Sequence, residues 1–181
     1  MTKMISRQSL LYTGIPVVLA ALFIAQAGRA DAFILLLHGI LIVFGYIAAI
    51  SDLKTRKISN LLVLAMIAAW AAVMTLKLFL DTSQAVILLG ESALGFALGG
   101  VLFLIVYLIS GKGLGSGDVK FMAGAGLYLR FGGVLPAVFF GTLLAAFTGL
   151  ALILAKRIGR KDMIPLAPFL YIGILITVFL Q

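Results

Sequence analysis

Cysteine is absent from this chain of 181 residues, and histidine occurs only once, as His38. The missing cysteines exclude disulfide bonds, thiolate nucleophiles and cysteine-ligated zinc, and a single histidine excludes a metal site built from several imidazoles. We therefore expect no metal and no other cofactor. The reactive groups that the chain offers are carboxylates, hydroxyls, amines and the backbone.

Charge is also scarce. Charged residues make up 11% of the sequence, hydrophobic residues make up 64%, and the mean hydropathy is +1.25. Because a soluble domain usually carries about 25% charged residues, this chain has too few to cover a surface exposed to water. Its apolar stretches also lack the strict alternation of barrel strands. The sequence therefore predicts an all-α, polytopic transmembrane helical bundle embedded in the lipid bilayer.

The few charges are mostly basic, and the formal net charge is +8. In a soluble protein this excess would indicate nucleic-acid binding. Here the basic residues lie in short loops between apolar stretches, which is typical of membrane proteins, and no nucleic acid is expected as a partner.

The apolar stretches define the expected membrane spans. A hydrocarbon core of roughly 30 Å needs about 20 helical residues, and six stretches approach that length: 10–27, 32–50, 61–80, 85–109, 134–155 and 164–180. Residues 119–131 would be only about 20 Å long as a helix, and we interpret them as a short or tilted span. Residues 1–181 thus form one domain, with a six-helix catalytic core in 32–181 and an extra N-terminal helix in 1–30.

The first stretch permits two interpretations. Residues 1–7 are basic, an apolar segment follows, and Ala25-Gln26-Ala27 resembles a signal peptidase site. The apolar segment is longer than the usual core of a signal peptide, so we expect a retained helix. Removal of residues 1–27 would leave six spans in the same orientation.

The basic residues predict the orientation in the membrane. If the N-terminus is cytoplasmic and all seven segments cross, eleven basic residues face the cytoplasm and three face the other side. This asymmetry is the positive-inside pattern of a bacterial cytoplasmic (inner) membrane protein. The inner residues are Lys3, Arg7, Lys54, Arg56, Lys57, Lys112, Lys120, Lys156, Arg157, Arg160 and Lys161, and the outer ones are Arg29, Lys77 and Arg130.

Asp52 lies where the span 32–50 meets a basic loop that runs to Asn60. A carboxylate is costly at the edge of hydrocarbon, and at a helix C-terminus it opposes the helix dipole, so a functional reason is favoured. The alternative is a solvated acid paired with Lys54 or Arg56. Ser59 or Asn60 can cap the helix that follows.

Asp118 follows a run of alternating glycines in the second cytoplasmic loop. The spacing of these glycines matches neither a phosphate loop nor a dinucleotide motif. A backbone free of side chains at Gly113, Gly115 and Gly117 can lie against an extended peptide and pair with it. The alternative is that Asp118 only caps the next helix, with the glycines as a linker.

Asp52 and Asp118 are predicted to face the same side of the membrane. Two carboxylates close in space share a proton over part of the pH range. One can then take a proton from water while the other donates one to a carbonyl oxygen, which hydrolyses a peptide without a metal or a covalent intermediate. We therefore interpret the two aspartates as a candidate catalytic pair.

The other polar residues are weaker candidates. Asp31, Asp81 and Asp162 lie in loops, where solvation or ion pairing is expected. Glu91 lies inside the span 85–109, and its role stays open. His38 is expected to be a hydrogen-bonded structural residue. Gly95 and Gly99 form a GxxxG pattern, which favours close packing of helices.

Three segments resemble the type IV prepilin peptidase family, membrane aspartic proteases with a GxGD motif. Residues 52–60 resemble the family's first catalytic loop, in which an aspartate is followed by Arg, Ile, a small residue and Asn. Residues 113–121, GLGSGDVKF, resemble the second catalytic loop. Residues 164–170, IPLAPFL, resemble the proline- and phenylalanine-containing segment that enters the last span.

The resemblance implies that Asp52 and Asp118 cleave the leader of a prepilin or pseudopilin after a glycine, at the cytoplasmic face. Larger members carry a region with cysteine pairs that is associated with methylating the new N-terminus. Since this sequence has no cysteine, the resemblance implies peptidase activity without methyltransferase activity, as in the compact peptidases of tight-adherence (Flp) pilus systems. Residues implied to lie near the site are Asn60, Lys120, Pro165 and Pro168.

Two other classes deserve comparison. Presenilin and signal-peptide-peptidase proteases also use a GxGD aspartate, but their partner aspartate follows a tyrosine, whereas Ser51 precedes Asp52 here. A small transporter could use the two acids to bind protons or cations. Transport sites usually lie near the bilayer midplane between inverted repeats, and the sequence contains no visible repeat.

Overall fold

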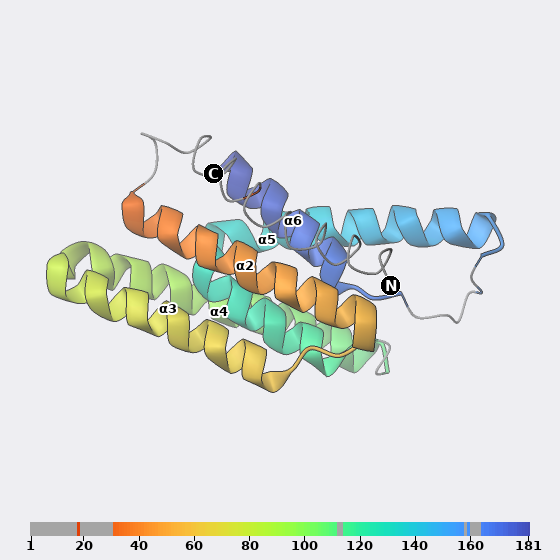
Figure 1. Cartoon of the computed structure of the whole chain (residues 1–181), viewed down its shortest axis with the longest axis horizontal. Coiled ribbons are helices and arrows are strands. Elements are labelled where there is room, and N and C mark those ends of the chain that lie inside the picture. The colour runs from red at the N-terminus through yellow and green to blue at the C-terminus, as the bar shows by residue number, and fades with distance from the viewer. Residues whose placement is uncertain (1–17, 19–30, 112–113, 158, 160–163) are drawn as a thin grey trace, which may run out of the picture.

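The computed structural model of the chain describes residues 18, 31–111, 114–157, 159 and 164–181. In this part the chain forms α2 (Ala32–Thr55), α3 (Asn60–Leu80), α4 (Thr82–Ile109), α5 (Ser116–Leu154) and α6 (Ala167–Leu180) (Figure 1). The first four are long and apolar enough to cross a membrane. The predicted fold class is confirmed, since the chain is a helical, multi-pass membrane protein. The expected helix in 1–30 and Gly113 fall outside the described residues, apart from Val18.

Local capping explains where the helices begin. The side chain of Asp31 accepts a hydrogen bond from the Phe33 N–H at 3.2 Å, and that of Ser59 accepts one from the Leu61 N–H at 3.2 Å. Ser59 is therefore the cap of α3, and Asn60 is its first helical residue. Such caps satisfy backbone donors that have no partner within the helix. The short connections make α2, α3 and α4 antiparallel neighbours (Figure 1).

The main difference from the sequence prediction lies in α5. Segments 119–131 and 134–155 were expected as separate spans, and α5 does consist of two helices, but they meet at Arg130, which is non-helical at φ 57° and ψ −176°. Gly132 and Gly133 are helical. The chain reverses at Arg130, so that residues 131–154 run back toward the end where α5 began (Figure 1). The two expected helices are therefore present, and they meet at Arg130 rather than between residues 131 and 134.

The last helix also differs from its prediction. The apolar stretch 164–180 is helical only from Ala167, and α6 has 14 residues. Its first turn contains Pro168, which lacks the N–H that a helix interior requires but is tolerated in a first turn.

The first part of α5 forms the centre of the bundle. Residues 121–129 are all buried, and the Tyr128 hydroxyl donates a buried hydrogen bond of 2.6 Å to the Met66 carbonyl of α3. Large apolar side chains on α3, α4 and the second part of α5 are exposed instead. This is the distribution of a bundle whose outer surface faces lipid rather than water.

Glycines bring the central helices into backbone contact. A Cβ atom on Gly95 of α4 would overlap the Gly126 carbonyl of α5, and one on Gly99 would overlap the Met122 carbonyl. A Cβ atom on Gly173 of α6 would overlap the Ala137 carbonyl. The close packing expected from the GxxxG pattern is therefore confirmed, because a side chain at these positions would push the helices apart.

Polar residues away from these contacts have definite surroundings. Glu91 accepts a hydrogen bond of 3.1 Å from Arg130, and Lys77 donates to Asp31 at 3.0 Å and to Gln84 at 3.1 Å. The imidazole of His38 is buried, and neither ring nitrogen has a hydrogen-bond partner in the part of the chain that the structure describes. The expectation of a hydrogen-bonded histidine is therefore wrong.

Candidate active site

Asp52 lies in the last turn of α2 and is only 6% exposed. The loop that follows folds back over the helix end, because the Ser51 hydroxyl donates to the Lys57 carbonyl at 2.8 Å. Arg56 makes this reversal in the left-handed region, at φ 53°. Residues 56–58 are thereby held next to the Asp52 carboxylate.

Asp118 is the third residue of α5 and is 8% exposed. Gly115 occupies the capping position, and its backbone N–H hydrogen-bonds to the Asp118 carboxyl, so Asp118 also contributes to the start of the helix, as the alternative interpretation expected. A carboxylate in the first turn is favoured by the helix dipole. Its Oδ1 is buried and has no hydrogen-bond partner among the described residues.

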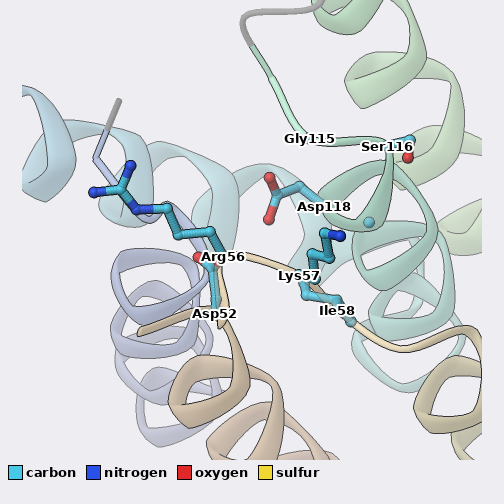
Figure 2. Close-up of a pocket in the computed structure, with 8 residues that line it drawn as sticks. Asp52, Arg56, Lys57, Ile58, Gly115, Ser116 and Asp118 are labelled. Atoms are coloured by element: carbon cyan, nitrogen blue, oxygen red, sulfur yellow. The ribbon is translucent and has the colours of Figure 1, made fainter. Parts of the chain in front are cut away.

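The two carboxylates line one pocket, although they come from different helices. The pocket has a volume of about 290 Å³, and Figure 2 shows both side chains reaching into it, with Arg56 beside Asp52. Its lining residues are Asp52, Arg56, Lys57, Ile58, Gly115, Ser116, Gly117 and Asp118. The fold thus brings together the two acids on which the sequence argument depends.

A backbone amide of α6 binds Asp52. The Ala167 N–H donates a buried hydrogen bond of 3.0 Å to Asp52 Oδ2. Ala167 is the first residue of α6, where a backbone N–H has no partner within its own helix. This donor offsets part of the cost of placing a carboxylate at the C-terminal end of α2.

Asp52 also differs from the solvated loop acid that the sequence left as an alternative. Within the described residues, ion pairs join Lys77 to Asp31 and Arg130 to Glu91, and neither involves Asp52. Its carboxylate is buried and bonded to backbone. Because burying a carboxylate is costly, buried carboxylates in proteins usually have a bonding partner or a function.

The other predicted site residues take three different positions. Gly115 lines the pocket, and a Cβ on it would lie 3.0 Å from Asp118 Oδ2, so the glycine leaves room for the carboxylate. A Cβ on Gly117 would lie 3.1 Å from Ile58 Cβ, so this glycine lets α5 approach the first loop. Lys120 donates to Asn60 Oδ1 at 2.9 Å and ties the start of α5 to the start of α3.

Pro165 and Pro168 flank the Ala167 donor and do not line the pocket. The segment 164–170 therefore meets Asp52 through backbone rather than through its proline side chains.

Sequence reasoning missed four residues of the pocket wall: Arg56, Lys57, Ile58 and Ser116. Lys57 entered that reasoning only as a marker of orientation, and Arg56 entered it as such a marker, as a possible ion-pair partner of Asp52 and as part of the segment 52–60. The available signal was a pair of basic residues four and five positions after a carboxylate in one short loop. As for metal ligands, the described residues contain no cluster of three or more His, Cys, Asp or Glu.

A multi-pass helical membrane protein with two buried carboxylates in one pocket at one end of the bundle has the equipment for acid–base chemistry beside lipid. The family model described as the type IV leader peptidase family matches residues 39–154, which include Asp52 and Asp118. The chain belongs to this family, and the resemblance seen in the sequence is confirmed.

A curated relative gives the same family. The chain is 27% identical over 168 residues to the prepilin leader peptidase/N-methyltransferase of Bacillus subtilis (strain 168), covering 92% of this chain and 65% of the relative. The chain thus spans somewhat less than two thirds of that protein. No solved structure matches.

Proposed function

We propose that the chain is an aspartic endopeptidase that removes the leader peptide from prepilins or pseudopilins. The observation that carries this proposal is the pocket lined by Asp52 and Asp118 in a member of the leader peptidase family. The name of the Bacillus subtilis relative supports the substrate class. The family match favours this function over a presenilin-type protease or a transporter.

The two carboxylates take different roles in the proposed reaction. Asp52 Oδ2 accepts the Ala167 N–H, an interaction that a carboxylate makes well, so Asp52 acts as the general base. Asp118 Oδ1 lacks a donor among the described residues, so Asp118 holds the shared proton and acts as the general acid. Each carboxyl thereby has the protonation state that its step requires.

The proposed step needs only water and the two acids. Asp52 takes a proton from a water molecule while the oxygen of that water attacks the scissile carbonyl carbon. At the same time Asp118 gives its proton to the carbonyl oxygen. The tetrahedral intermediate then collapses: a proton passes from Asp52 to the leaving nitrogen, the C–N bond breaks, and a hydroxyl proton returns to Asp118. Both carboxyl groups thereby return to the protonation states that they had before the reaction.

The substrate reaches this pocket from the membrane in the proposed arrangement. The apolar helix of a prepilin lies in the bilayer beside the enzyme, and its basic leader stays in the cytoplasm. Exposed basic residues at the pocket end of the bundle support a cytoplasmic pocket. They are Lys54, Arg56, Lys57 and Lys120.

We further propose that the chain cleaves without methylating the product and without a bound metal. The missing cysteines support the first point, because the resemblance associates methylation with cysteine pairs. Mass spectrometry of the mature pilin should show an unmodified N-terminus. Turnover should persist in EDTA, and activity that EDTA removes and zinc restores would contradict the proposed chemistry.

Coexpression with a prepilin tests the function itself. The full chain should remove the leader, and N-terminal sequencing of the product should locate the cut after a glycine. Asp118→Asn should abolish removal while the protein remains in the membrane. Asp81→Asn is the matched control, since Asp81 caps α4 away from the pocket and asparagine also caps helices. Normal processing by Asp118→Asn would refute the assignment.

A further inference from the structure

A second cavity lies at the other end of the first part of α5 from Asp118. It has a volume of about 390 Å³ and opens where α5 breaks at Arg130. Polar groups of Glu91, Arg130 and Gln181 line it together with apolar side chains, and it shares no residue with the aspartate pocket. The proposed peptidase reaction leaves it without a role.

The cavity contains a charge pair in an apolar setting. Arg130 Nη1 lies 3.1 Å from Glu91 Oε2, and the two side chains are 23% and 44% exposed. The neighbouring Leu94 and Phe131 are exposed large hydrophobic residues, as expected for a surface that faces lipid. An ion pair open to hydrocarbon is costly, so a polar ligand that covers it stabilises the protein.

The guanidinium of Arg130 keeps unused hydrogen-bonding capacity. It carries five N–H donors in a planar fork, and the pair with Glu91 uses Nη1. Its Nε is buried and has no partner within the described part of the chain. Arg130 also has a positive φ of 57°, a strained backbone state that clusters at binding sites.

The setting of the cavity indicates the class of its ligand. Leu94 and Phe131 at its edge are exposed large hydrophobic side chains, while Glu91 and Arg130 in its wall carry charges of both signs. A molecule that covers all of these groups needs an apolar part next to charges of both signs. A phospholipid with a zwitterionic headgroup has this combination.

We propose that this cavity binds the headgroup of a zwitterionic aminophospholipid such as phosphatidylethanolamine. The phosphate lies on the Arg130 fork, which matches phosphate geometry, and the primary ammonium lies on the Glu91 carboxylate. Glu91 and Arg130 together are neutral, which suits a zwitterion better than an anionic lipid. A choline headgroup lacks the N–H donors that Glu91 accepts.

Native mass spectrometry of the purified full chain tests this proposal. The delipidated protein is offered equal amounts of phosphatidylethanolamine, phosphatidylcholine and phosphatidylglycerol, and wild type should retain the ethanolamine lipid preferentially. Arg130→Gln should weaken its retention about tenfold, the effect of losing a hydrogen bond to a charged group. Arg157→Gln is the matched control, because this exposed arginine is not part of the cavity.

Glu91→Gln tests the site independently of the break in α5, since Glu91 lies on the regular helix α4. It should remove the preference for the ethanolamine over the choline and glycerol lipids. Equal retention of all three lipids by wild type would overturn the proposal, as would unchanged retention in both variants. Displacement of the lipid by an equal concentration of soluble phosphoethanolamine would also overturn the assignment to lipid.

Discussion

At the scale of residues, the two carboxylates of the pocket differ in their hydrogen bonding. Asp52 Oδ2 accepts the Ala167 N–H at 3.0 Å, and the Asp118 carboxyl has a backbone donor in Gly115, but Asp118 Oδ1 is buried with no hydrogen-bond partner among the described residues. A carboxyl that must donate a proton gains nothing from a nearby donor, while one that must accept a proton is held in place by it. The asymmetry therefore supports Asp52 as base and Asp118 as acid.

Ala167→Pro removes the donor to Asp52 while leaving both aspartates in the chain. We expect kcat for leader cleavage to fall about tenfold or more, because a hydrogen bond to a charged group contributes roughly 1.5–3 kcal/mol. Proline is tolerated at a first helical position, so α6 should persist. Ala167→Gly keeps the N–H and is the control. Equal rates for the proline and glycine variants would show that this amide has no role.

The role of a side chain is easier to predict from the sequence than the role of a backbone group. Asp52 and Asp118 stand out because carboxylates are rare at the edges of apolar runs. The Ala167 amide could not be predicted, because its role depends on where α6 begins and on its distance from a helix far away in the chain. Gly117 looked like a flexible loop residue, and only the contact with Ile58 shows that it permits close packing.

At the scale of elements, the backbone contact between α4 and α5 holds the short central helix that carries Asp118. Gly95→Ala would place a methyl group on the Gly126 carbonyl, so we expect a loss of about 1–3 kcal/mol or more in the free energy of unfolding. Unfolding in mixed detergent micelles measures it. Gly90→Ala, on the same helix with nothing within 4 Å, should be neutral or slightly stabilising. Equal stability of the two variants would contradict this account.

A second contact between elements, the ion pair of Asp31 with Lys77 of α3, depends on pH. The hydrogen bond from Lys77, followed by that from the Phe33 N–H, lowers the pKa of Asp31 from its ordinary value of 3.8. A lowered folded-state pKa means that the stabilisation is present above pH 3.8 and is lost as the pH falls through the folded-state value. The Tm of wild type should therefore drop in this acid range more than that of Asp31→Asn, which keeps a capping side chain. Parallel Tm curves would contradict this reading.

The break in α5 shows why element boundaries are hard to predict. Gly132-Gly133 is the obvious place for an interruption, yet both residues are helical and Arg130 makes the turn. An arginine with positive φ has no local sequence signature. The surrounding packing, including Glu91 and the backbone of Gly95, selects this conformation.

At the scale of the whole molecule, hydropathy predicts the crossings, while the order of packing around the first part of α5 depends on contacts that no periodicity reveals.

The proposed orientation puts the turn between α3 and α4 outside the cytoplasm. Since the chain has no native cysteine, single cysteines test it cleanly. In spheroplasts an impermeant maleimide should label Ser83→Cys at once, and Lys54→Cys only after lysis. The reverse pattern would place the aspartate pocket on the wrong side.

The central claim, that Asp52 and Asp118 act as one catalytic unit, is tested most directly by single-turnover cleavage of a purified prepilin in nanodiscs. Asp52→Asn and Asp118→Asn should each slow cleavage by about 10²–10⁴-fold, the contribution of positioned acid–base groups. The double variant should be no slower than either single variant, because groups that act together are not additive. Near-normal cleavage by either single variant, or a double variant slowed by the product of the two effects, would contradict a shared site.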